Sequence, residues 1–91
     1  MELRVFGTLR QFAGAKQVEV DVGDGDTVRN VLERLAAEYP ALGEHLLDDA
    51  GSLWSSINVL VNGRSISFLD GLESIIQEGD ALAIFPAVGG G

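Results

Sequence analysis

One segment of the chain shows the apolar spacing of a helix, and segments with a period of two lie on both sides of it. The helical spacing covers residues 27–39, where Thr27 is a favourable N-cap and Pro40 disfavours helical geometry at the residue before it. Its apolar positions are Val28, Val31, Leu32, Leu35 and Tyr39. A single helix between strands favours a small α+β domain in which a sheet wraps one main helix.

Alternating apolar residues predict the strands of this sheet. The expected strands are residues 3–5, 18–22, 57–61, a brief edge strand at 64–68, and 81–85. The dipeptide Asn62-Gly63 is a strong hairpin signal and explains the edge strand that follows it. The order β, β, α, β, β, β suggests a β-grasp fold with a mixed sheet of four to five strands.

The connections are also predicted. Residues 9–12 are expected to form a short helical turn between the first two strands. After Pro40, residues 41–53 are expected to be irregular, with one turn around residues 44–47. We expect residues 1–86 to form one β-grasp domain, and residues 87–91 to be a flexible tail.

Composition limits what such a domain does. The 91 residues are 46% hydrophobic and contain no cysteine, which excludes disulfides, thiolate metal sites and a cysteine nucleophile. The net charge of −8 disfavours nucleic acid and anionic membranes. It suggests partners with basic faces, and solubility or a salty cytoplasm accounts for it equally well. No apolar run approaches the ~20 residues that span a bilayer, so we expect a soluble, cytoplasmic protein.

Three large apolar residues are expected on the sheet face opposite the helix. If the first and last strands are neighbours, as in a β-grasp fold, Phe6 and Phe85 project from that face. Leu60 points the same way by alternation. We interpret the three as a docking patch in preference to scattered exposed apolar residues, because all flank the route to the C-terminal end.

The chain ends in three glycines after Pro86, which extends the backbone outward. Glycine has no Cβ, so Gly90 and Gly91 can enter a channel too narrow for other residues. The α-carboxylate of Gly91 is ionised at neutral pH and can attack the α-phosphate of ATP if an enzyme aligns it. Terminal glycines also occur as disordered ends without function, and the triple glycine alone does not decide between these readings.

Other groups of polar residues are poor candidates for a metal, catalytic or phosphate-binding site. His45, Asp48 and Asp49 are expected to be solvated loop residues, so no metal site is assigned. The serines lack a histidine partner at a defined spacing, which makes a hydrolase a poor candidate. Residues 23–26 lack the spacing and the lysine of a phosphate loop. Trp54 is expected in the core or at its shoulder.

Five blocks in order carry a family resemblance: residues 5–10 (VFGTLR), 58–63 (NVLVNG), 68–71 (FLDG), 78–80 (EGD) and 85–91 (FPAVGGG). In these blocks the chain resembles the MoaD/ThiS sulfur carriers over nearly its whole length. It is more similar to the longer MoaD-like branch, which includes small archaeal modifier proteins and a carrier for an alternative cysteine synthesis.

The resemblance implies a carrier and not a catalyst. An E1-like enzyme would adenylate Gly91 with ATP, and a sulfurtransferase would supply the sulfur of a thiocarboxylate. The carrier itself would hold no cofactor. An acceptor enzyme, such as the large subunit of a molybdopterin synthase, would then take the sulfur. The family's aromatic contact positions match Phe6 and Phe85.

The remaining partner-binding residues are expected to be Leu60, Pro86, Val88 and Gly89. At Gly89 the chain departs from the family, whose members usually carry alanine, serine or threonine there.

Alternatives with the same activation remain open. Sulfur donation for cysteine synthesis or tRNA thiolation uses the same chemistry. A ubiquitin-like modifier would instead join Gly91 to a substrate lysine. An inert β-grasp interaction module would need no reactive end.

Overall fold

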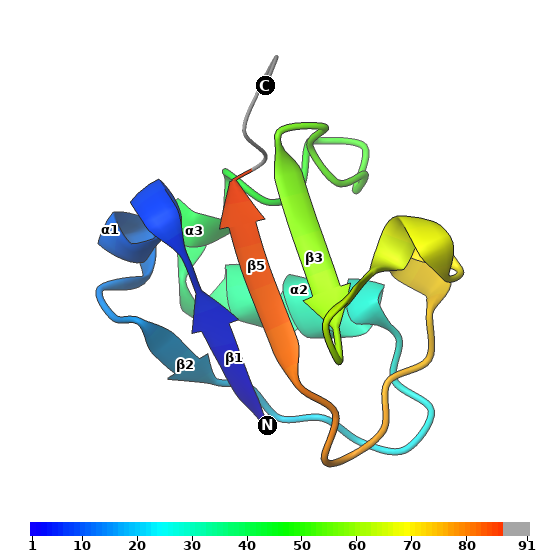
Figure 1. Cartoon of the computed structure of the whole chain (residues 1–91). Coiled ribbons are helices and arrows are strands. Elements are labelled where there is room, and N and C mark those ends of the chain that lie inside the picture. The colour runs from blue at the N-terminus through cyan, green and yellow to red at the C-terminus, as the bar shows by residue number, and fades with distance from the viewer. Residues whose placement is uncertain (87–91) are drawn as a thin grey trace.

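The computed structural model describes residues 1–86, in which five strands form one mixed sheet in the order β2-β1-β5-β3-β4 (Figure 1). The strands are β1 (Glu2–Val5), β2 (Gln17–Glu19), β3 (Ile57–Val61), β4 (Arg64–Ser65) and β5 (Leu82–Pro86). Three α-helices accompany them, α1 (Arg10–Ala13), α2 (Val28–Glu38) and α3 (Pro40–Gly43). Short 3₁₀ helices are η1 (Gly7–Leu9), η2 (Ile66–Phe68) and η3 (Gly71–Glu73).

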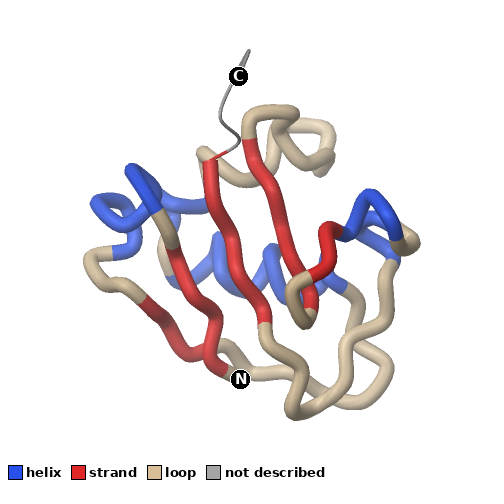
Figure 2. Tube along the Cα trace, viewed as in Figure 1, coloured by secondary structure: helices blue, strands red, loops and turns tan. Residues whose placement is uncertain are grey.

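Strands β1 and β5, from opposite ends of the chain, are parallel neighbours in the middle of the sheet. Val5 lies opposite Ile84 in that pair, and Val59 of the antiparallel strand β3 lies opposite Ile84 on its other side. Strands β2 and β4 are the two edges, each antiparallel to its neighbour. This topology, with α2 across one face of the sheet (Figure 2), confirms the predicted β-grasp architecture.

Helix α2 begins where the sequence predicts. The Thr27 hydroxyl accepts a hydrogen bond from the Asn30 amide at 3.2 Å, and the Asn30 side-chain oxygen accepts one from the Thr27 amide at 3.1 Å. This reciprocal capping satisfies two amides that no helical carbonyl can reach. The helix buries one stripe against the sheet, formed by Val28, Val31, Leu32 and Leu35.

The segment after α2 corrects one prediction. Pro40 does not open an irregular connection, because it is the first residue of helix α3. Proline is accommodated at that position, where its missing N–H would have no helical partner and its fixed φ suits the helix. The predicted turn lies directly after α3, and an isolated bridge between Leu47 and Leu53 closes the loop. Leu42 and Leu46 anchor this segment in the core.

The predicted edge strand over residues 64–68 is also partly wrong. The hairpin forms as expected, since Asn62 and Gly63 have φ of 53° and 81°, the positive values that a tight two-residue turn requires. However, β4 ends at Ser65, and the chain continues as the 3₁₀ helix η2, where the Ser65 side chain accepts a hydrogen bond from the Ser67 amide. This turn lets Ile66 enter the core, at 5% exposure.

Candidate functional site

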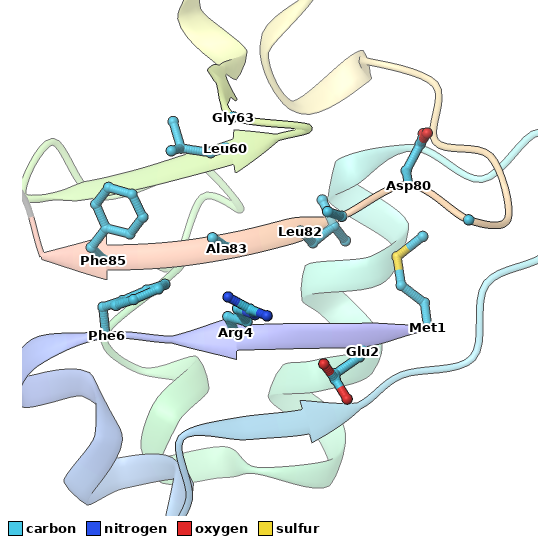
Figure 3. A pocket seen from close by; sticks show the side chains of 12 residues that line it. Met1, Glu2, Arg4, Phe6, Leu60, Gly63, Asp80, Leu82, Ala83 and Phe85 are labelled. Atoms are coloured by element: carbon cyan, nitrogen blue, oxygen red, sulfur yellow. The ribbon is translucent and has the colours of Figure 1, made fainter.

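The sheet face opposite α2 carries the predicted aromatic residues. Phe6, Phe85 and Leu60 project from three adjacent strand regions toward the same side, with the helix behind the sheet (Figure 3). The rings of Phe6 and Phe85 meet edge to face, with centroids 5.2 Å apart and an interplanar angle of 82°. The expectation that these three residues share the outer face is confirmed, and all three are partly exposed.

These side chains border a shallow hollow of about 650 Å³ on the outer face. Ala83 lies at its centre, opposite Arg4 on one side and Leu60 on the other. The small side chain of Ala83 leaves room between larger neighbours. Glu2 and Asp80 add carboxylates at the end of the hollow away from the phenylalanines (Figure 3). The result is an apolar centre with charged borders, which suits contact with another protein.

The phenylalanine end of the hollow adjoins the last described residue, Pro86. Pro86 belongs to β5 and lies opposite Ile57 of β3, so the strand continues one residue beyond the predicted end. Gly7 contacts it from the other side, because a Cβ on Gly7 would lie 3.0 Å from Pro86 Cγ. Gly7 also has φ of +60°, which favours glycine. The start of the C-terminal segment is thereby held between two neighbouring elements.

Sequence reasoning assigned no role to Gly7 or Arg10. The Arg10 Nε donates a hydrogen bond to the Val5 carbonyl at 2.8 Å, and its guanidinium lies 5.5 Å from the Phe6 ring centroid. A cation over an aromatic face is attracted by the ring quadrupole. The available signal was a glycine directly after Phe6, followed by an arginine within the predicted helical turn at residues 9–12.

At the opposite end of the outer face, two turns are joined through Asn62 and Asp80. The Asn62 side chain donates to the Asp80 carboxylate at 3.0 Å and accepts from the Ala81 amide at 2.9 Å. The pKa of Asp80 is lowered by hydrogen bonds from the Gln77 amide and from Asn62. These bonds fix the loop that delivers the chain into β5.

The weaker candidates have structural roles. His45 stacks on Phe12 with ring centroids 3.9 Å apart, and Asp48 accepts hydrogen bonds from the amides of Ala50 and Ser52. Within residues 1–86 no three His, Cys, Asp or Glu side chains are grouped as a metal site. The core interpretation of Trp54 is wrong: it is 45% exposed and donates its indole N–H to the Glu44 carbonyl.

The residues expected to react lie outside the described residues. These are Gly90 and Gly91, together with the expected contact residues Val88 and Gly89. Among residues 1–86, no helix has the length and apolar character needed to cross a bilayer.

A last described strand in the middle of a mixed sheet, with a helix across one face and an apolar patch on the other, defines the class of ubiquitin-like β-grasp proteins. The chain belongs to the ThiS family, whose sequence profile matches residues 3–91. This confirms the family resemblance drawn from the sequence blocks.

Three relatives illustrate the breadth of this family. Small archaeal modifier protein 3 of Haloferax volcanii is 43% identical over 91 residues, covering 100% of this chain and 98% of the relative. Sulfur carrier protein CysO of Mycobacterium tuberculosis is 39% identical over 69 residues, 74% of each chain. A chain in the crystal structure of an Amycolatopsis orientalis BexX/CysO complex has a TM-score of 0.83 and 32% identity, and the match covers 99% of this chain and 98% of that one.

The relatives are small carrier and modifier proteins, and one of them is found in a complex with a partner. The family therefore includes both sulfur carriers and protein modifiers.

Proposed function

We propose that this chain is a sulfur carrier and not itself an enzyme. In this proposal an E1-like enzyme aligns the Gly91 carboxylate with ATP, a carboxylate oxygen bonds to the α-phosphorus, and pyrophosphate leaves. Hydrosulfide supplied through a sulfurtransferase then attacks the acyl carbon and displaces AMP, which gives a thiocarboxylate. The carrier holds no cofactor of its own, since ATP is bound by the activating enzyme. Both the carrier and its partners are proposed to act in the cytoplasm.

The observation that carries the proposal is the likeness to carriers and modifiers along the whole chain, in matches that extend to residue 91. The geometry of residues 1–86 supports it. Phe6, Leu60 and Phe85 are proposed to dock the partner, while Pro86 starts the segment that Val88, Gly89 and Gly90 would lead into the partner's active site. The similarity to a chain from a BexX/CysO complex supports a docking role for this face.

Among acceptors, the large subunit of a molybdopterin synthase is the leading proposal, on the weight of the MoaD-like resemblance. Sulfur donation for cysteine synthesis is the alternative that the likeness to CysO favours. Donation for tRNA thiolation would use the same thiocarboxylate.

Intact mass spectrometry tests the activation step. The full chain is incubated with an E1-like adenylating enzyme, ATP and a sulfide donor, and we expect the mass change of one oxygen-to-sulfur exchange at the C-terminus. A variant that lacks Gly91 keeps residues 1–86 intact and should show no exchange. An unchanged mass of the full chain, with an enzyme that activates a ThiS-family control protein, would contradict the proposal.

A protein modifier is the second candidate, favoured by the 43% identity to small archaeal modifier protein 3 over the whole chain. In that case the activated Gly91 forms an isopeptide bond with a substrate lysine and AMP leaves. Immunoblots of native cell extract against this chain distinguish the two functions. A modifier gives a ladder of larger species that is lost on deletion of Gly91, whereas a dedicated carrier gives only the free protein.

A further inference from the structure

The cationic side chains are unevenly distributed along this acidic chain. Residues 1–16 hold three of the six cations but one of the fourteen acidic residues. The fold gathers the three cations at one place: Arg4, Arg10 and Lys16, with Gln17, line a hollow of about 180 Å³ beside Phe6. We call these three cations the basic corner.

The basic corner differs from Arg29 and Arg34 in its partners. Arg29 pairs with Glu73 at 2.8 Å, and Arg34 pairs with Asp26, so each of these charges is locally neutralised. No ion pair within residues 1–86 neutralises a side chain of the basic corner. Arg4 and Lys16 are exposed. The corner is therefore a local cluster of positive charges on a protein whose net charge is −8.

The basic corner is continuous with the apolar outer face. Arg4 and Phe6 line both the small hollow and the larger hollow that contains Leu60 and Phe85. Arg4 projects from β1 on the same side as Phe6 (Figure 3). A partner seated over the two phenylalanines would reach the basic corner without leaving the surface.

We propose that the activating partner presents an acidic segment to the basic corner, with carboxylates facing Arg4 and Lys16 beside an apolar contact on Phe6. This inference rests on the proposed function and names the chemistry of its docking partner. It revises the sequence-based expectation of a basic partner face, since the charge beside Phe6 is locally positive, while the carboxylates of Glu2 and Asp80 lie at the other end of the hollow. Opposite charges at the border of an interface raise the association rate and fix orientation.

The test uses the full-length chain and the E1-like enzyme of the mass experiment, in an ATP–pyrophosphate exchange assay. Arg4→Glu and Lys16→Glu reverse exposed charges at the basic corner. Arg64→Glu is the matched control, because Arg64 is an exposed cation on β4 at the opposite edge of the sheet. At low salt we expect KM for the carrier to rise about tenfold in each corner variant, with kcat unchanged and the control close to wild type. At an ionic strength of about 1 M, where charges are screened beyond ~3 Å, the difference should vanish.

Each outcome decides a different point. Exchange with the wild-type chain, but an unchanged or lower KM in both corner variants, overturns this inference and leaves the proposed function standing. No exchange with the wild-type chain overturns the proposed function and this inference with it. Circular dichroism of Arg4→Gln and Lys16→Gln separates misfolding from lost binding, and these variants should show an intermediate KM. If the wild-type chain binds RNA and Arg4→Glu abolishes this binding, the basic corner binds phosphate groups. That result would overturn the proposal of an acidic protein segment.

Discussion

The two faces of the central strands differ in burial and in their expected roles. On the inner face, Val5 and Ile84 are 0% exposed and pack under α2. The next residues along the chain, Phe6 and Phe85, stand on the outer face, where no layer within residues 1–86 covers them. Adjacent residues therefore have different roles. The inward-facing residue stabilises the fold, and the outward-facing residue is proposed to contact a partner. Mutations one residue apart should separate the two.

The largest effect is expected on the inner face. Ile84→Ala removes a fully buried side chain from the strand that pairs with both β1 and β3, and leaves a cavity. We expect the free energy of unfolding to fall by about 2–5 kcal/mol. Urea denaturation, monitored by circular dichroism, measures this change in the free energy of unfolding. If Ile84→Ala lowers the free energy of unfolding no more than the outer-face variant Phe85→Ala does, the inner face has no special role in stability.

The second-largest loss of stability is expected at Gly7, which contacts Pro86 at the start of the C-terminal segment. Gly7→Ala places a Cβ 3.0 Å from Pro86 at a φ of +60°, which combines backbone strain with a close contact. We expect a loss of about 1–3 kcal/mol in urea denaturation. Gly14→Ala is the control, with φ of +76° and nothing within 4 Å of the added Cβ. Equal losses in both variants would show that the Pro86 contact has no energetic weight.

A smaller loss of stability, but a larger loss of function, is expected on the outer face. Phe85→Ala removes one ring of the edge-to-face pair with Phe6, which stabilises by about 0.5–1.5 kcal/mol. In the exchange assay we expect a clear rise in KM for the carrier, because the docking contact is lost. Phe68→Ala, on a residue 81% exposed on η2, should leave KM unchanged. A fully active Phe85→Ala would remove the docking role from this face.

The smallest effect is expected away from both faces, at the start of α2. The Arg34 guanidinium, helped by the Gly23 amide, lowers the pKa of Asp26 from 3.8 to about 2. Because the folded value is the lower one, this contribution to stability is present above pH 3.8 and is lost as the pH falls through about 2. Asp26→Asn should flatten the decline of the urea midpoint over this acidic range. If the urea midpoint declines equally with falling pH in the wild type and in Asp26→Asn, the Asp26–Arg34 pair does not contribute to stability in this way.

Local patterns predicted most of the fold because they depend on near neighbours. Period-two alternation assigned the face of Phe6, Leu60 and Phe85, and the Thr27 cap marked the start of α2. The errors occurred where tertiary packing chose between local options. Burial of Ile66 turned the predicted edge strand into a 3₁₀ helix, and Leu42 anchored a helix at a proline expected to begin a loop.

By itself, the sequence determined which side chains of the central strands and of α2 face inward, where the main helix starts and where the hairpin turns, because each depends on residues a few positions apart. Tertiary structure alone decided the contacts between the two ends of the chain. Placing β1 beside β5 joins Phe6 to Phe85 and Gly7 to Pro86, and it sets Arg4 and its neighbouring cations at the border of the apolar face. The spacing of residues within a strand carries no information on which strand becomes its neighbour, so the combined surface exists only once the sheet is assembled.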